Sequence, residues 1–597
     1  MLNMITLHTY VKILPILMSL VLVGVLCSPF VPFALNDCFF RLYPLSIGIS
    51  AFCIISFLCS LWLHKGVFVF TYFDGLIVAI IAYYLLRYDY SLRLADWKIF
   101  YAILLMLLWF SIRIMLSYCP DIRKILPIFI SLVGCMLSVW GVMQLYGLVD
   151  SAHPLFRITG PFFNPGPYSG YLALLLPVSL HGFLSTQGRI RYLHILSMAL
   201  MFCILPAAMS RSAWMAIAVS MLWVLVMQKG WLKQFWKYCK KTPYRAIGCI
   251  MIGCFIVFFV AVGVFQIKAN SAYGRLLIWK NTCQAISEHP FIGYGVGRFP
   301  AVYGKAQADY FASGQATDLE KYVAGYVEYA FNDYLQLTIE GGILLLILVL
   351  ICGVLVFRQG LIRQEYGLCG ALLAFAFFAV SSYPLQVLPF GIVIVVFSAF
   401  CVTVNGGSSL KGIWRLTLFL SLLLCIGGGM ITCKLSNLPK TYKEWGMIEN
   451  AYNKKLYDIA LNGYRMLFPD LKYSRLFLFN YANSLREMGH LMEACDVLEY
   501  AKLVDCNSQI WNLQGIYYQE AQNFYLAEFC FKYSLQLVPM RLYPYYLLAK
   551  LYSEPQYFNK EKAKDMANIV LIQCPKVYSS QVDLMREEMR ILLDDIN

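Results

Sequence analysis

The sequence predicts an all-α protein in which a polytopic membrane helical bundle precedes an α-solenoid of helical repeats. Three observations predict this fold class. Hydrophobic residues make up 60% of the 597-residue chain and charged residues only 14%, whereas soluble globular proteins contain about 25% charged residues. Apolar runs long enough to cross a bilayer recur up to about residue 433, and a helical-repeat spacing begins near residue 440.

The apolar runs define a membrane domain at 1–433. A bilayer core needs about 20 apolar residues per helix, and by that measure we expect about 12–13 spans. They lie near 11–28, 43–63, 67–86, 99–118, 124–147, 167–186, 192–209, 212–228, 246–265, 334–357, 366–383, 388–404 and 413–432. A polar insertion at 266–333 interrupts this series.

The basic loop 229–245 predicts the orientation of these spans. It carries Lys and Arg residues and no acid, and such loops remain in the cytoplasm. Counting outward places 148–166, the turn at 209–212, the insertion and everything after about 433 on the extracytoplasmic side. We therefore expect a multi-pass protein of the bacterial inner membrane with a periplasmic repeat domain. One miscounted span after the insertion would move that domain to the cytoplasm.

The overall charge and the cysteines exclude other classes of protein. A formal net charge of +15 would suit a nucleic-acid partner, but Lys and Arg lie mainly in short loops between apolar runs, so we expect no nucleic acid. Most of the 20 cysteines lie inside apolar segments. They form no Cys/His cluster with zinc spacing, and the sequence supports neither a metal site nor a cofactor.

The soluble region at 440–597 carries a tetratricopeptide-like pattern. Its best unit consists of Trp511, Gly515, Tyr518, Ala527, Phe531 and Pro539, with Gln514 where leucine is usual. Ala460, Ala494, Ala527 and Ala563 recur at intervals of 34, 33 and 36 residues. Small residues recur where paired helices cross closely. We expect three to four repeats, with the aromatic residues as packing residues and any partner on the concave face.

Three polar stretches stand out on the predicted extracytoplasmic side. They are RITGPFFNPGPYSGY at 157–171, MSRSAW at 209–214, and the insertion leading into FNDYLQLTIEGG at 331–342. Over about residues 150–350 the chain resembles the O-antigen ligase and O-antigen polymerase superfamily, which includes bacterial protein O-oligosaccharyltransferases. The resemblance implies a C-type glycosyltransferase-like bundle. It also implies transfer of a glycan from a polyprenyl-diphosphate donor to an acceptor hydroxyl, with inversion at the anomeric carbon.

Two arginines are the principal candidates for catalysis. Arg211 lies between two segments long enough to span, where a charge is costly unless it faces a cavity or a partner; an interfacial arginine that ends a helix is the alternative. Arg275 lies in YGRLLIWK, which also reads as an interfacial amphipathic helix. The resemblance implies that Arg211 holds the donor diphosphate and that Arg275 is the second functional arginine. Their planar, permanently charged groups suit phosphate and require no metal.

Further cations are expected around the same anionic group. The candidates for donor binding are Arg157, Lys280 and Arg298. Arg157 precedes a Gly-Pro and Asn-Pro loop, which by resemblance shapes the donor cavity or else simply leads into the next helix. Arg298 either takes part in catalysis or neutralises nearby acids. The glycines at 293, 295 and 297 are read as a tight turn.

The catalytic base is open. Related ligases often carry a His-Asn pair at the start of the helix after the insertion, but here Phe331 precedes Asn332. Phenylalanine cannot accept a proton. The candidate substitutes are Asp333, Glu340, Glu328 and His289. Alternatively, no strong base is needed because the diphosphate is a good leaving group, and Asp333 simply complements the helix dipole.

The appended repeats bear on the acceptor. Such arrays usually hold peptides or proteins, so we expect a protein partner there. We rank a protein O-oligosaccharyltransferase above an O-antigen ligase, which transfers to lipid, and above a Wzy-type polymerase. A non-enzymatic membrane scaffold or transporter is the other class. A transporter would show internal symmetry and ionisable residues in mid-span, and neither is clear in this sequence.

Overall fold

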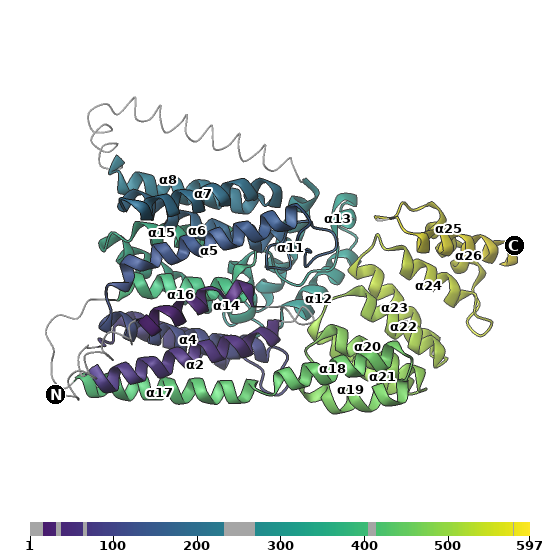
Figure 1. Cartoon of the computed structure of the whole chain (residues 1–597). Coiled ribbons are helices and arrows are strands. Elements are labelled where there is room, and N and C mark those ends of the chain that lie inside the picture. Colours follow the sequence, from purple (N-terminus) through teal and green to yellow (C-terminus); the bar gives the residue numbers. More distant parts are fainter. Residues whose placement is uncertain are drawn as a thin grey trace, which may run out of the picture.

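The computed structural model describes residues 16–31, 38–63, 68–231, 269–403, 413–576 and 578–596. Within these ranges the chain forms helices and no strand, which confirms the all-α class. A bundle of long helices carries a smaller helical array at one end, and the C-terminus lies in that array (Figure 1).

The bundle is that of a multi-pass membrane protein. Its helices are Ile16–Leu26, α2 (Cys38–Leu63), α3 (Tyr72–Leu86), α4 (Asp96–Tyr118), α5 (Ile122–Leu145), α6 (Pro165–Ser185), α7 (Arg189–Ala208), α8 (Arg211–Gln228), α14 (Asp333–Ile362), α15 (Tyr366–Val380), α16 (Leu388–Val402) and α17 (Ile413–Leu435). Short 3-10 turns, η1 (Ser28–Phe30) and η2 (Pro384–Gln386), lie between them. Seven described helices are long and apolar enough to cross a membrane. Every expected span overlaps a helix except 246–265, which lies outside the described residues together with most of loop 229–245.

The helix α6 forms the centre of the bundle. It packs against α5, α7, α8 and α15, and its residues from Pro167 to Leu180 are buried. Gly170 allows this packing, because a side chain there would collide with the ring of Phe378 on α15. The N-terminus of α6 is thereby fixed at the end of the bundle that carries the insertion.

The helix α14 is broken at Gly342, which has a φ of 72° inside the helix. The loop that follows α11 occupies the break. Tyr294 N donates to Ile339 O at 2.8 Å, and Ile343 N donates to Pro290 O at 2.8 Å. Backbone groups freed by a break at membrane depth need such partners. Gly293, Gly295 and Gly297 all have positive φ, so this segment is the expected tight turn.

The insertion folds over one end of the bundle as α11 (Ala269–Glu288), α12 (Phe299–Ala312) and α13 (Asp318–Val323). An irregular segment, 324–332, then returns the chain to the start of α14. We refer to this segment as the return loop.

The C-terminal array consists of helical hairpins. Its helices are α18 (Leu438–Asn453), α19 (Tyr457–Leu471), α20 (Arg475–Glu487), α21 (Leu491–Val504), α22 (Ser508–Glu520), α23 (Phe524–Leu537), α24 (Leu542–Tyr552), α25 (Lys560–Ile572) and α26 (Ser580–Ile596). The recurring alanines lie on α19, α21, α23 and α25, and all four are fully buried. A side chain at Gly515 would collide with the Phe531 ring, so this glycine allows α22 to approach α23 closely.

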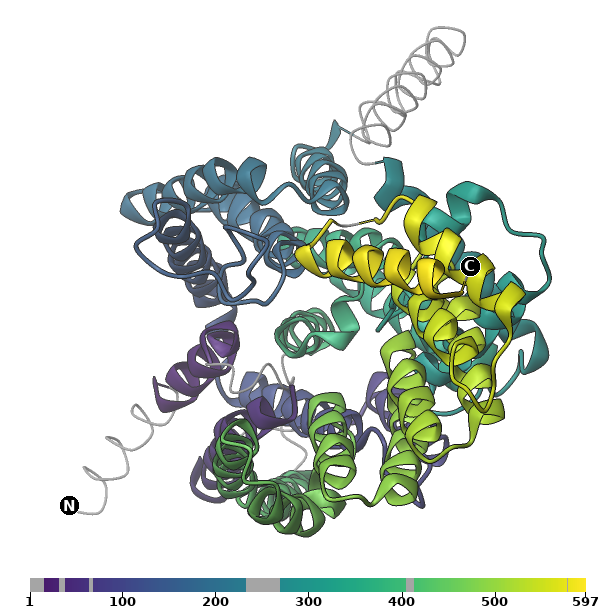
Figure 2. The same cartoon turned by 90° about the vertical axis from the view of Figure 1, so that its right-hand side faces the viewer.

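The array lies at the same end of the bundle as the insertion. The membrane helix α17 leads almost directly into α18 (Figure 1). Tyr500 donates to Leu92 O at 2.6 Å, and Gln307 on α12 donates to Leu537 O at 2.6 Å. Seen from this end, the array curves from its green first helices to its yellow last ones, close to the teal insertion (Figure 2). The array therefore contacts both the membrane helices and the insertion.

Candidate active site

A cavity of about 330 Å³ lies where α6, α8 and α11 approach one another. Its wall consists of the loop before α6, the first residues of α6, the turn between α7 and α8, and two positions on α11. Three of the expected cations, Arg157, Arg211 and Arg275, line it. The structure thus brings together residues that the sequence separates into three distant motifs. We call this space the arginine cavity.

The loop that carries Arg157 is held by one buried amide. Gln144, at the end of α5, accepts from Gly160 N at 2.7 Å and from Thr159 N at 3.0 Å. Its own NH₂ group donates to Gly160 O at 3.1 Å. Gly160 has a φ of 56°, a left-handed conformation that glycine adopts readily. The Arg157 side chain itself is exposed.

The turn between α7 and α8 presents a helix N-terminus to the cavity. Met209 ends α7 with a left-handed φ of 49°, Ser210 is the N-cap of α8, and Arg211 is its first residue. Met209, Ser210, Arg211 and Ser212 all line the arginine cavity. The positive end of a helix dipole favours an anion at this position.

Arg275 completes the cavity from the insertion. Its guanidinium carbon lies 5.6 Å from the centroid of the Phe331 ring, within the range of a cation–π contact. The Phe331 ring packs edge-on against Tyr383, with 5.1 Å between centroids. Burial, and then the charge of Arg211, lower the pKa of Arg275. No described carboxylate pairs with Arg275, so two mutually repelling cations face a space that an anion can occupy.

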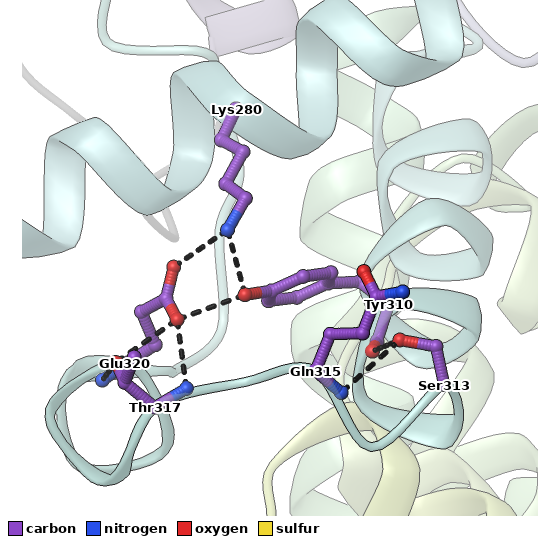
Figure 3. Close-up of polar contacts among 6 residues, drawn as sticks. All are labelled: Lys280, Tyr310, Ser313, Gln315, Thr317 and Glu320. Atoms are coloured by element: carbon purple, nitrogen blue, oxygen red, sulfur yellow. Dashed lines mark hydrogen bonds and ion pairs between the residues drawn. The ribbon is translucent and has the colours of Figure 1, made fainter.

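Lys280 lies outside this cavity and pairs within the insertion (Figure 3). It donates to Glu320 at 2.9 Å and to Tyr310 at 2.7 Å. Tyr310 also donates to Glu320, at 2.8 Å. Partial burial raises the pKa of Glu320, but hydrogen bonds, of which the one from Lys280 has the largest effect, lower that pKa to about 2. These contacts hold α13 against α11.

Arg298 also faces a carboxylate rather than the arginine cavity. It donates to Asp89, in the loop between α3 and α4, at 2.7 Å. The hydrogen bond from Ser91 is the largest of the causes that lower the pKa of Asp89 to about 2. The pair joins the insertion to the membrane helices.

Asp333 and Glu340 are enclosed within the bundle. Asp333 is 1% exposed and accepts from Leu385 N at 2.8 Å. Glu340 is 2% exposed and accepts from Lys98 at 2.6 Å and from Gln336 at 2.8 Å. Gln336 in turn accepts from Ala330 N at 2.9 Å, next to Phe331. Neither carboxylate lines the arginine cavity, and both join α14 to neighbouring elements.

Glu328 and His289 are the two candidate bases that solvent reaches. His289 packs edge-on against Tyr294 beside the break in α14. Glu328 lies on the return loop, three residues before Phe331. Burial raises the pKa of Glu328, against the opposing charge of Arg475 and a hydrogen bond with Tyr326. It is therefore a solvent-accessible carboxylate that protein surrounds on most sides.

The return loop also contacts the repeat array. Arg475, on α20, lies 5.2 Å from the centroid of the Tyr326 ring and pairs with the buried Asp505 at 3.3 Å. Burial raises the pKa of Asp505 to about 6. Cys506 Sγ donates to Val327 O at 3.1 Å. The array thus holds the segment that carries Glu328 and Phe331.

Sequence reasoning did not identify Gln144 or Arg475. Gln144 could have been noticed as an amide at the end of the apolar run that precedes the Gly-Pro loop. Arg475 has no such signal, because its partners lie in the insertion and in the next repeat.

Part of the chain matches a known protein family. Residues 196–350 match the Wzy_C family, O-antigen ligase. The chain carries an O-antigen ligase domain. This domain runs from α7 through the insertion into α14, and it contains Arg211 and Arg275 but not Arg157. The match supports the O-antigen ligase and polymerase superfamily and glycosyl transfer of the O-antigen ligase type. No curated protein matches the chain.

Proposed function

We propose that this protein is an O-oligosaccharyltransferase that moves a glycan from a polyprenyl-diphosphate donor to a hydroxyl of an acceptor protein. One observation carries the proposal: Arg157, Arg211 and Arg275 converge on one cavity beside the N-terminus of α8. A diphosphate is the part of the donor that such a cavity suits, because it offers several oxygens to planar guanidinium groups.

The arrangement supports a single displacement. The acceptor oxygen attacks the anomeric carbon and forms the new C–O bond while the bond to the diphosphate oxygen breaks. The leaving diphosphate keeps the electron pair. Arg211 and Arg275 offset the negative charge that grows on it, and they are already in place before the reaction begins. Arg157 binds the same group from the exposed loop.

Glu328 is the carboxylate that we assign to the proton of the acceptor hydroxyl. Two features support this choice over Asp333 and Glu340: solvent access and a position on the same loop as Phe331. Asp333 and Glu340 we assign to positioning, since both are buried and hydrogen-bonded within the bundle.

A protein acceptor is favoured by the position of the repeat array. The array contacts the return loop through Arg475 and Cys506, so a polypeptide held by the array lies near the arginine cavity. Because the array contacts the return loop, it lies on the same side of the membrane as the arginine cavity. We assign both to the periplasm, where the lipid-linked glycan is used. A C-terminal alkaline phosphatase fusion tests this location, and an inactive fusion would contradict it.

Ligation of a glycan to lipid is the second candidate, because the matched family is that of the O-antigen ligases. Membranes of a deletion strain complemented with wild type, Arg211→Ala or Arg189→Ala separate the two. Arg189 is an exposed arginine at the start of α7 and serves as the matched control. We expect Arg211→Ala alone to abolish protein glycosylation at unchanged abundance. Loss of surface polysaccharide instead would establish the lipid acceptor.

A further inference from the structure

A second cavity, of about 340 Å³, lies between the insertion and the repeat array. Residues 324 and 325 of the return loop form one wall, and the segment between α23 and α24, at 538–543, forms another. The segment before α26 and the first turns of that helix close it. This junction cavity shares no lining residue with the arginine cavity.

The lining of the junction cavity is apolar except for two cations. Val538, Leu542 and Val582 are buried apolar residues in its wall. Arg541 and Lys576 supply the charge. The lining contains no carboxylate, and no described acid pairs with either cation.

Arg541 is partly buried, whereas Lys576 is exposed, and the two like charges repel each other. Burial lowers the pKa of Arg541, and burial followed by the charge of Arg541 lowers the pKa of Lys576. Lys576 donates to Ala324 O at 3.3 Å and lies 5.8 Å from the centroid of the Tyr322 ring. These contacts hold its ammonium in the cavity without neutralising it. An anion placed between the cations would offset both the desolvation and the repulsion.

We propose that the junction cavity binds a carboxylate carried by an apolar segment of a partner polypeptide. The planar donor fork of Arg541 takes the two carboxylate oxygens, and Lys576 adds a second positive charge. Val538, Leu542 and Val582 contact the flanking apolar side chains. A sugar acid fits this wall less well, because its hydroxyl groups would lose water without gaining partners.

The location of the cavity suggests what the binding achieves. Two residues of its wall, 324 and 325, are the first residues of the return loop, which also carries Glu328 and Phe331. A polypeptide held here lies at one end of that loop, and the Phe331 ring lies against Arg275 at the other. The role as an acceptor site rests on the proposed function, whereas the binding itself does not.

Fluorescence anisotropy on the full detergent-solubilised chain tests the binding. The probe is fluorescein-Gly-Leu-Glu-Leu-NH₂, with glutamine in place of glutamate as its neutral counterpart. A third peptide, fluorescein-Gly-Leu-Leu with a free C-terminal carboxylate, distinguishes a chain terminus from an acidic side chain. We expect at least one acidic peptide to bind about tenfold or more tightly than the neutral one, as a charge-assisted pair requires.

Variants of the cations decide the site. Arg541→Met and Lys576→Met, which keep the side-chain length, should each weaken the acidic peptide to the level of the neutral one. Lys454→Met, at an exposed lysine after α18, is the control and should bind like wild type. Because Lys576 is exposed, its replacement leaves the fold intact even if Arg541→Met does not. Equal binding of all peptides, or undiminished binding of the acidic peptide by both variants, overturns the proposal. The proposal also fails if glucuronate or inorganic phosphate displaces the probe while unlabelled acidic peptide does not.

The Arg211→Ala protein separates this proposal from the proposed function. It should bind the acidic peptide as wild type does, while it transfers no glycan. If both Arg211→Ala and wild type bind the peptide but neither glycosylates protein, the junction cavity stands and the transfer proposal fails.

Discussion

The guanidinium of Arg275 lies over the ring of Phe331, with 5.6 Å between its central carbon and the ring centroid. The sequence resemblance implies that Phe331 stands where O-antigen ligases often carry histidine. Its backbone has a left-handed φ of 49°, so the ring is directed by a turn that ends the return loop. Phe331 therefore contacts an arginine of the cavity, and its phenyl ring cannot accept a proton.

Replacing the Phe331 ring should weaken donor use. Phe331→Leu removes the cation–π contact, which contributes about 0.5–2 kcal/mol at such a site, and we expect transfer to fall by about 2- to 30-fold. Phe331→Tyr keeps the ring face and should retain most activity. The measurement is the dependence of initial transfer rate on donor concentration. An unchanged rate in Phe331→Leu would show that Arg275 does not depend on the ring.

The break in α14 should tolerate no side chain at Gly342. Gly342→Ala places a Cβ against Phe291 O and also strains the positive φ of 72°. We expect the variant to be lost from membranes, as seen by immunoblot. Gly353→Ala is the matched control, because Gly353 lies on the same helix with open space around it. Equal abundance of the two variants would contradict this account of the break.

The raised pKa of Glu328 predicts how the transfer rate falls on the acidic side of its pH profile. A base must be deprotonated to act, so transfer should be lost as pH falls through a pKa that lies above the usual glutamate value. Glu328→Gln should lower the maximal rate and remove that acidic fall. The test is a pH–rate profile of transfer in membranes. A variant with the same acidic fall as wild type would assign the titration to another group.

The pair formed by Lys98 and Glu340 distinguishes positioning from catalysis. Glu340→Gln leaves the buried Lys98 unpaired, and breaking a buried pair costs about 3–5 kcal/mol. We expect low abundance for this variant. The double variant Lys98→Met with Glu340→Gln removes both charges and keeps the bond to Gln336, so abundance and transfer should both recover. Recovery of abundance without transfer would make Glu340 catalytic.

The fold and the arginine cavity were accessible to sequence reasoning because their signals are local. Apolar runs predict membrane helices wherever the structure describes them, and the recurring buried alanines mark the second helix of each hairpin. Arg157 and Arg211 are charges beside helix ends, and Arg275 lies in a motif, YGRLLIWK, that was recognised by its resemblance to the family.

The carboxylate partners of Lys280 and Arg298 could not be predicted from local sequence patterns. Lys280 pairs with a carboxylate 40 residues away and Arg298 with one 209 residues away. Only the folded chain shows that these acids neutralise them outside the arginine cavity. The junction cavity likewise depends on the contact between the array and the insertion, which no local pattern encodes.

Transfer by the purified chain tests the central claim most directly. A polyprenyl-diphosphate glycan is supplied with a hydroxyl-bearing acceptor protein, and the product is followed for wild type, Arg275→Ala and Arg189→Ala. We predict glycosylated protein with wild type and Arg189→Ala, and a loss of about 100-fold or more with Arg275→Ala, the scale at which removing one electrostatic stabiliser acts. Undiminished transfer by Arg275→Ala would contradict the assignment of the arginine cavity to the donor diphosphate.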